Sequence, residues 1–174
     1  MRKGVAAVGS AVFFVVAPGT VAGLLPWWLT GWQPGAPFAH LLPVRLAGLT
    51  MLVAGATVLI HAFARFVAEG FGTPAPVAPP ARLVVGGLYR YVRNPMYLAV
   101  TVAVLGQALL LWRPALVVYA AIATAAMVAF VAGYEQPALA RQFGGEYEAY
   151  RRAVPGWWPR LTAWRPPPDE QRPR

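Results

Sequence analysis

The sequence predicts an all-α fold: a polytopic helical membrane protein with about four transmembrane helices and an amphipathic helix close to the C-terminus. Two observations support this prediction. Hydrophobic residues make up 58% of the 174 residues and charged residues only 12%, which is unusual for a soluble domain of this length. The apolar residues are also grouped into long runs, separated by connections rich in proline, glycine or charge. We expect residues 1–174 to form a single membrane-embedded domain.

The first two apolar runs predict transmembrane helices over residues 5–25 and 44–68. The first run follows a short basic stretch, as in a signal peptide, but it is long enough to cross a hydrocarbon core of about 30 Å. We expect a kink at Pro18, because proline removes a helical hydrogen bond. The connection over residues 26–43 is rich in Pro and Trp, which is typical of a loop at the membrane interface.

The last two apolar runs, residues 95–111 and 115–134, predict two further spans joined by a very short connection at Trp112. So short a connection forces the two helices to run antiparallel. The start of one helix must then lie beside the end of the other. This predicts that Asn94 lies near Glu135, although the two residues are far apart in the sequence.

Polar segments lie before and after this pair of helices. Residues 69–94 form the longest polar connection, and its prolines favour an extended, stiff conformation. Over residues 137–160, large apolar side chains recur every three or four positions, which indicates one face of an amphipathic helix. That face comprises Leu139, Phe143, Tyr147, Tyr150 and Val154. Such a helix could lie on the membrane surface or close as a lid over a site between the last two spans. The tail, residues 165–174, is expected to be disordered.

The charge distribution predicts the orientation. With the N-terminus inside and four spans, all 15 Lys and Arg residues except Arg45 and Arg113 fall on one side of the membrane. Because Lys and Arg collect on the cytoplasmic side, we expect an inner membrane protein of bacterial type with both termini in the cytoplasm. This topology accounts for the net charge of +9, so no nucleic-acid partner is expected. With no Cys and two well-separated His residues, no metal site is expected either.

The most distinctive stretch is residues 86–97, which contains three tyrosines and two arginines. Asn94 is a favoured N-cap and Pro95 a favoured first helical residue, so a helix should begin at Pro95. The exposed N–H groups of its first turn, together with Arg93, attract a carboxylate or phosphate. The tyrosine faces suit a cation. A ligand with an anionic end and a cationic centre would match both features.

A second group of polar residues lies near the end of the second predicted span. His61 and Arg65 are four residues apart and share one helix face. Polar groups at membrane depth are candidates for function. The alternative is an arginine whose charged end reaches the interface beside a neutral, hydrogen-bonded histidine.

Four blocks of residues occur in a characteristic order. They are Gly70-Phe71-Gly72-Thr73-Pro74-Ala75-Pro76, Leu83-Val84-Val85-x-Gly87-x-Tyr89-Arg90-Tyr91-Val92-Arg93-Asn94-Pro95-Met96-Tyr97, Glu135-Gln136-Pro137-x-Leu139 and Phe143-Gly144-x-Glu146-Tyr147-x-x-Tyr150. Together they resemble the isoprenylcysteine carboxyl methyltransferase family, and the related phospholipid methyltransferases are similar. The resemblance extends over about residues 44–160.

The resemblance implies a membrane methyltransferase that uses S-adenosyl-L-methionine and releases S-adenosyl-L-homocysteine, with the cofactor at the cytosolic ends of the last two spans. The acceptor would be a lipophilic molecule or lipid from the bilayer, either an isoprenylcysteine-type carboxylate or another acid, thiol or amine. The implied cofactor-binding residues are Tyr89, Arg93, Asn94, Pro95, Tyr97, Glu135, Gln136, Tyr147 and Tyr150. The implied catalytic residues are Arg93 and Arg90, which would orient a carboxylate acceptor, and Glu135, the one obvious base.

Two residues depart from the family pattern. Asn94 stands where the family often has His, and Gln136 replaces the second residue of a Glu pair. Glutamine keeps a hydrogen-bond acceptor but lacks the charge. If the second acid normally pairs with the cofactor's ammonium group, Glu135 must do so alone.

Two other functions stay open at this stage. One is a membrane reductase that binds a nicotinamide cofactor at the same helix ends, which a preference for NADPH over S-adenosyl-L-homocysteine would favour. The other is a small transporter or assembly protein without enzymatic activity. The sequence has no evident internal repeat and few ionisable residues within the spans, which argues against a transporter.

Overall fold

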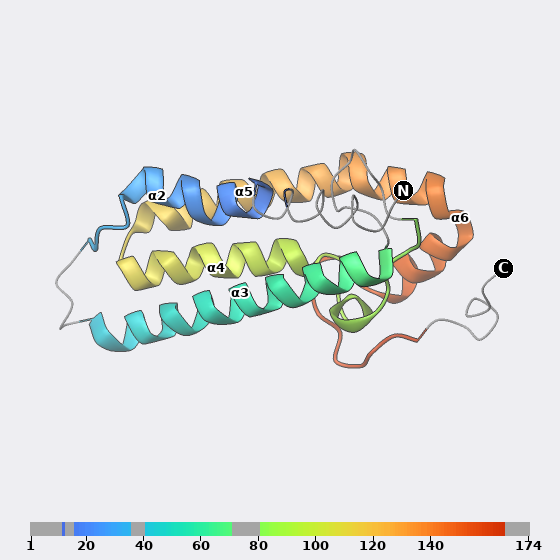
Figure 1. Cartoon of the computed structure of the whole chain (residues 1–174), viewed down its shortest axis with the longest axis horizontal. Coiled ribbons are helices and arrows are strands. Elements are labelled where there is room, and N and C mark those ends of the chain that lie inside the picture. Colours follow the sequence, from blue (N-terminus) through green and yellow to red (C-terminus); the bar gives the residue numbers. More distant parts are fainter. Residues whose placement is uncertain (1–11, 13–15, 36–40, 71–80, 166–174) are drawn as a thin grey trace.

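The computed structural model describes residue 12 and residues 16–35, 41–70 and 81–165. Every regular element within these ranges is helical, as Figure 1 shows, so the chain is an all-α protein. The elements are η1 (Thr20–Leu24), α2 (Leu25–Thr30), α3 (Leu42–Gly70), η3 (Gly87–Arg90), α4 (Pro95–Leu111), α5 (Pro114–Phe130), η4 (Val131–Glu135) and α6 (Gln136–Ala153). The expected disordered tail and the first half of the expected first span lie mostly outside the described residues.

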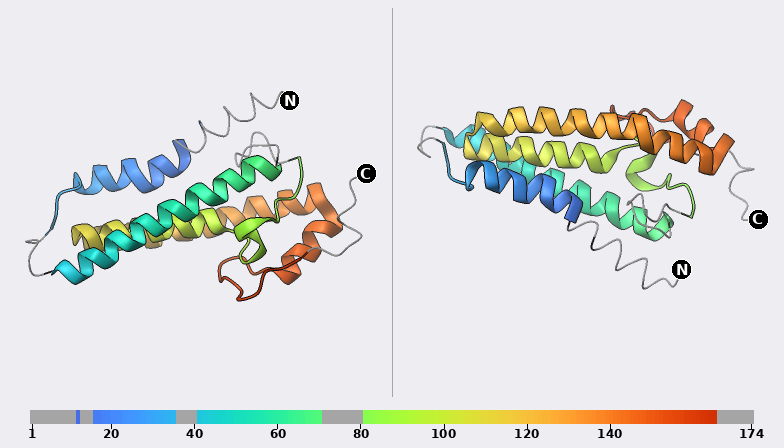
Figure 2. Two further views of the ribbon diagram at one scale, coloured as in Figure 1. Left: turned by 60° about the horizontal axis from the view of Figure 1, so that its bottom comes forward. Right: turned by 90° about the horizontal axis from the view of Figure 1, so that it is seen from above.

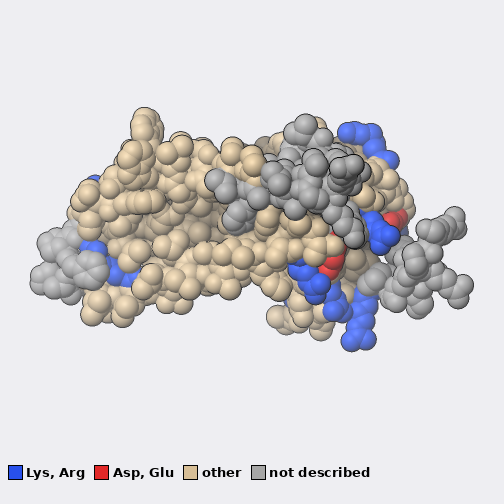
Figure 3. Space-filling model, in the orientation of Figure 1, with Lys and Arg blue, Asp and Glu red and all other residues tan. Residues whose placement is uncertain are grey.

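Length and composition identify the membrane-crossing helices. Two of the described helical segments are long and apolar enough to cross a bilayer, Leu42–Glu69 and Pro114–Ala153, and most of their residues are not buried within the protein. The apolar helix Pro95–Leu111 is shorter. In Figure 3 the Lys and Arg side chains gather at the ends of the molecule, mainly the end that carries α6, and the described surface between them is uncharged. The chain is a polytopic helical membrane protein.

Helix α4 lies between α3 and α5 (Figures 1 and 2). Glycines let the backbones of α3 and α4 approach closely. A Cβ added at Gly48 would lie 2.5 Å from the backbone nitrogen of Leu110, and one added at Gly106 would lie 2.6 Å from that of Leu52. Gly55 makes a similar approach to α4. Close backbone contact of this kind is how membrane helices gain packing energy without a hydrophobic driving force.

Helices α4 and α5 form the antiparallel hairpin that the short connection predicts. Trp112 adopts a left-handed conformation with φ 54°, and the Arg113 N–H donates to the carbonyl of Ala108 at 2.9 Å. The hydroxyls of Thr101 and Thr124 lie 2.9 Å apart and bond the two helices to each other. The start of α4 therefore lies at the same end of the bundle as the end of α5.

The first helix ends later than the sequence suggests. It is helical from residue 16, passes through the π-turn η1 and continues as α2 to Thr30, where Gly31 ends it in a left-handed conformation. The prediction that a loop begins at residue 26 is therefore wrong. The expected kink at Pro18 stays a prediction, and the irregularity that the structure shows in this helix is η1, just before Pro26.

Two side chains from other helices explain why the chain stays helical through Pro26. Proline has no N–H for the carbonyl of Ala22, and Gln107 Nε2 donates to that oxygen at 2.7 Å. Tyr119 Oη donates to the carbonyl of Val21, also at 2.7 Å. Neighbouring helices commonly satisfy the backbone groups that proline frees in a membrane helix.

The amphipathic segment comprises a kinked helix and a return segment. Within α6, Gly144 has φ 52° and ψ −124°, which bends the helix. The apolar face of α6 packs inward: Tyr147 and Tyr150 are buried with Val154, and Leu83 and Trp164 pack against them. This face therefore covers the protein and is not available to lie on a membrane surface. After α6, residues 154–165, here named the C-terminal strap, return along residues 90–94 (Figure 1).

Candidate functional site

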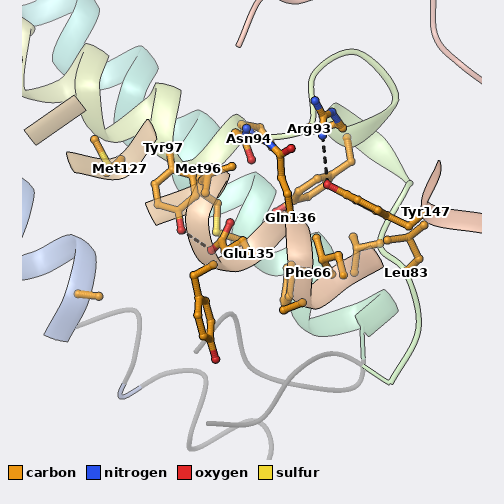
Figure 4. Close-up of a pocket in the computed structure, with 18 of the residues that line it drawn as sticks. Phe66, Leu83, Arg93, Asn94, Met96, Tyr97, Met127, Glu135, Gln136 and Tyr147 are labelled. Carbon is orange, nitrogen blue, oxygen red and sulfur yellow. Dashed lines mark hydrogen bonds between the residues drawn. The ribbon is translucent and has the colours of Figure 1, made fainter. Parts of the chain in front are cut away.

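A cavity of about 550 Å³ lies where the start of α4, the end of α5 and α6 meet. Its volume is in the range of small-molecule sites. All nine predicted cofactor-binding residues line it, and Figure 4 shows several of them. These residues are Tyr89, Arg93, Asn94, Pro95, Tyr97, Glu135, Gln136, Tyr147 and Tyr150. Within the described ranges, no group of three His, Cys, Asp or Glu side chains is arranged to hold a metal ion.

The hairpin places Glu135 across from the first turn of α4. Tyr97 Oη donates a hydrogen bond of 2.5 Å to Glu135 Oε1 (Figure 4). This contact confirms that the start of α4 meets the end of the α5 segment. Glu135 is the last residue of the π-turn η4, which is followed by Gln136 and then Pro137. A π-turn inserts one extra residue per turn and so rotates the side chains that follow it, which is a common feature of functional sites.

Arg93 lies between the cavity and the strap. Its Nη1 donates to Tyr147 Oη at 3.2 Å, and its Nε donates to the carbonyl of Val154 at 2.9 Å. The guanidinium is thus held in one orientation at the cavity wall, as Figure 4 shows. An arginine fixed in this way supplies a preorganised positive charge at the cavity wall.

Asn94 occupies the N-cap position of α4 but does not cap the helix. Its side chain makes no capping hydrogen bond, and its Nδ2 donates to the carbonyl of Gly156 at 3.0 Å. The prediction that the Asn94 side chain caps α4 is therefore wrong, because the strap competes for that side chain. The N–H groups of the first turn of α4 are left without this cap at the cavity wall.

The tyrosines link the walls of the cavity to each other. Tyr150 Oη donates to the carbonyl of Tyr89 at 2.6 Å, and Tyr89 Oη donates to the carbonyl of Ala62 at 3.4 Å. Burial raises the pKa of Tyr89 well above its ordinary value, so its hydroxyl stays protonated. Through these bonds α6, residues 86–90 and α3 form a single framework around the cavity.

Arg90, His61 and Arg65 do not line the cavity. Arg90 Nε donates to the carbonyl of Trp164 at 2.7 Å, so this arginine holds the strap. Arg65 Nη1 pairs with Glu69 Oε1 at 3.0 Å, which favours a structural role for Arg65. His61 and Arg65 lie beside Gly87, where an added Cβ would be 3.5 Å from His61 Nε2 and 3.1 Å from Arg65 Nε.

Sequence analysis did not identify Glu69, which holds the turn that leads to Tyr89. Glu69 Oε2 accepts the N–H of Gly86 at 3.0 Å. Gly87, the next residue, has φ 56°, a conformation that glycine adopts readily. The available signal was the spacing of Arg65 and Glu69, which is that of a helical ion pair.

The apolar end of the cavity was also missed. Its lining comes from the first helix, α3, α4 and α5, and includes Ala17, Pro18, Val21, Leu59, Val100, Met127 and Val131. Met127, Val131 and Glu135 recur every four residues, so the sequence already indicated that these side chains share one helix face. The contribution of the first helix had no such signal, because it depends on how that helix packs.

The fold and the site define a class: a helical membrane protein whose helix ends enclose a polar cavity that continues into an apolar one. The sequence model of the phospholipid methyltransferase family matches residues 43–146, well over half of the chain, and the chain belongs to that family. The match covers α3, the α4–α5 hairpin and α6 up to its kink, and leaves the first helix and the strap outside. The comparison with curated proteins gave no match.

Proposed function

We propose that the protein is an S-adenosyl-L-methionine-dependent methyltransferase that methylates a lipophilic acceptor in a bacterial inner membrane, with both termini in the cytoplasm. The family supports a membrane methyltransferase that acts on lipid-like substrates. The observation that carries the proposal is the composition of the cavity, which joins a charged end to an apolar end. A methyl donor and a lipophilic acceptor need these two environments side by side.

The charged end suits the cofactor's amino acid portion. Arg93 and the uncapped N–H groups of α4 offer positive potential for a carboxylate. Glu135 offers negative charge for an ammonium group, with Tyr97 holding one of its oxygens and the other left to accept further bonds. Tyr147 and Tyr150 present aromatic surface for the sulfonium and the adenine. The residues therefore fit the group that the family implies.

The apolar end suits the acceptor. Side chains from the first helix, α3 and α5 line it, and most residues of α3 and α5 are not buried within the protein. When bound, the cofactor supplies an electrophilic methyl group on a sulfonium. The chain's part is to orient the acceptor's nucleophilic atom, exclude water and retain opposite charges at fixed positions. A carboxylate acceptor needs no base, whereas an amine must first lose a proton, for which Glu135 is the available group.

Calorimetry on the purified protein in lipid nanodiscs tests this proposal. We expect S-adenosyl-L-homocysteine to bind, and Glu135→Ala to weaken binding at least tenfold, which is about 1.4 kcal/mol and at the lower limit for a lost charged hydrogen bond. Glu148→Ala is the matched control, because Glu148 is half-exposed on α6 and pairs with Arg151. Binding of NADPH in preference to S-adenosyl-L-homocysteine would contradict the proposal and favour a reductase.

Transfer of a labelled methyl group identifies the acceptor. Prenylcysteine, phosphatidylethanolamine and small lipophilic acids and thiols are incubated separately with the protein and labelled cofactor. We expect label in an organic-soluble product with one acceptor class. Stable binding of the cofactor without transfer to any member of the panel would show that the acceptor lies outside these classes.

A further inference from the structure

Two large apolar side chains on the strap have no packing role in the fold. Trp158 is 81% exposed and Leu161 is 99% exposed, the highest values among the large hydrophobic side chains that the structure describes. Their neighbours point the other way. Val154 is fully buried, and the ring of Trp164 lies 5.3 Å from that of Tyr150. The strap is thus two-sided, with one side packed on the protein and the other presenting a tryptophan and a leucine.

The charge of the strap is of one sign. The strap carries Arg160 and Arg165 and no acidic residue. Arg151 and Arg152 lie just before it in the last turn of α6, where Arg151 pairs with Glu148. All four are at least partly exposed. A tryptophan and a leucine among arginines match the interface of an anionic bilayer leaflet, where aromatic rings sit at headgroup depth and each basic residue contributes about 1 kcal/mol.

The position of the strap fits such a contact. It lies at the end of the bundle where α3 ends and α4 begins, and it extends sideways from the bundle axis (Figures 1 and 2). Since α3 crosses the membrane, a segment beside its end lies at the level of one leaflet's headgroups. A protein partner would need acidic groups placed opposite the arginines. An anionic leaflet supplies negative charge along its whole surface, so we take the leaflet as the partner.

Backbone hydrogen bonds connect the strap to the cavity wall. The N–H of Arg93 donates to the carbonyl of Pro155, that of Arg160 to Tyr91, and that of Trp164 to Arg90, each at 2.9 Å. The side chains of Arg93 and Asn94 add bonds to Val154 and Gly156. A strap lifted from residues 90–94 would therefore release Arg93, which the proposed function places at the cofactor's carboxylate, and Asn94, which lines the same cavity.

We propose that the outer face of the strap, Trp158 and Leu161 with the flanking arginines, docks on the anionic phospholipid leaflet at the arginine-rich end of the bundle. The bilayer holds the strap from one side while residues 90–94 hold it from the other. Leaflet charge then controls how firmly Arg93 and Asn94 are positioned. This last statement rests on the proposed function; the docking itself does not.

Depth measurements by electron paramagnetic resonance test the docking. The chain has no cysteine, so Leu161→Cys gives a single site for a nitroxide. Gly145→Cys on α6 is the control, because a Cβ there meets nothing within 4 Å. Both proteins are placed in nanodiscs of phosphatidylcholine, with and without phosphatidylglycerol. We expect the label at 161 to be shielded from an aqueous nickel complex and open to oxygen, more so with phosphatidylglycerol, whereas the label at 145 stays open to the nickel complex. Equal nickel access at both sites, or no effect of phosphatidylglycerol, would overturn the proposal.

A binding measurement tests the coupling separately. In phosphatidylglycerol discs, we expect Trp158→Ser combined with Leu161→Ser to weaken S-adenosyl-L-homocysteine binding three- to tenfold, and Trp158→Phe with Leu161→Ile to restore it. Unchanged binding in the serine variant would refute the coupling and leave the docking intact. If the wild-type protein does not bind S-adenosyl-L-homocysteine, the proposed function and the coupling both fail, and the depth measurement still decides the docking.

Discussion

Arg93 and Asn94 each take part in two structures at once. Both line the cavity, and both donate to carbonyls of the strap. The sequence predicted the first of these roles from the residue types and their place before Pro95. It could not predict the second, because an asparagine before a helix has a local partner in the helix and a distant one in the strap. In the structure the Asn94 side chain bonds to the distant partner, the carbonyl of Gly156.

At the residue scale, Glu69 is the clearest target for mutation. We expect Glu69→Ala to lower affinity for S-adenosyl-L-homocysteine about fivefold, because losing the bond to the Gly86 N–H costs about 1 kcal/mol and loosens the turn before Tyr89. Glu69→Gln keeps an acceptor and should restore most of the affinity. Titration of the three proteins by calorimetry distinguishes these results.

If Glu69→Ala and Glu69→Gln weaken binding equally, the ion pair with Arg65 matters and the bond to Gly86 does not. If neither weakens binding, the turn does not depend on Glu69. Thermal unfolding of each variant in the absence of ligand serves as the control for a general loss of stability.

At the scale of elements, both described π-turns, η1 and η4, end just before a proline. In η1 the N–H of Leu25 donates to Thr20, and in η4 that of Gln136 donates to Val131; each donor directly precedes a proline. The wider turn accommodates the residue that cannot donate. The sequence shows both prolines but not that the helices continue through them, because continuation depends on partners such as Gln107. This explains why the loop expected from residue 26 is absent, whereas the hairpin of α4 and α5, fixed by the short connection, was predicted correctly.

The close backbone approach at the glycines between α3 and α4 leads to a prediction about stability. Gly106→Val adds side-chain atoms where the backbone of Leu52 already lies, and neither backbone has room to move aside. We expect a loss of at least 1–3 kcal/mol of stability, seen as a lower thermal transition in detergent and a lower yield of monodisperse protein. Gly23→Ala is the control, because its added Cβ meets nothing within 4 Å, and it should behave like the wild type. A Gly106→Val protein as stable as the control would mean that the helices pack differently.

At the scale of the whole molecule, charge predicts the orientation in the membrane. The absence of cysteine allows a direct test with single cysteines at Gln33, beside the α4–α5 turn, and at Gly145. In intact spheroplasts of a bacterial host, a membrane-impermeant maleimide should label Gln33→Cys, and it should label Gly145→Cys only after the membrane is opened. The expectation rests on the arginines, which concentrate at the end that carries α6. Labelling in the reverse pattern would place the cavity on the periplasmic side, where S-adenosyl-L-methionine is not made.

The fold class and the approach of the start of α4 to Glu135 could be predicted because they follow from apolar runs and one tight turn. The apolar end of the cavity could not, since Val21 reaches it only through the packing of the first helix against Tyr119 and Gln107. The sequence also left open whether the amphipathic face lies on the membrane surface or covers the site. Contacts of Tyr150 and Trp164 decide it in favour of the protein interior.

The order in which the chain is synthesised gives the strap another consequence. All the apolar helices precede residue 154, so the ribosome completes them before it reaches the segment that Arg93 and Asn94 bind. A nascent chain can therefore insert fully into the bilayer while these two residues still lack their carbonyl partners. A chain that stopped before residue 154 would keep every apolar helix and lack the carbonyls that fix the side chains of Arg93 and Asn94.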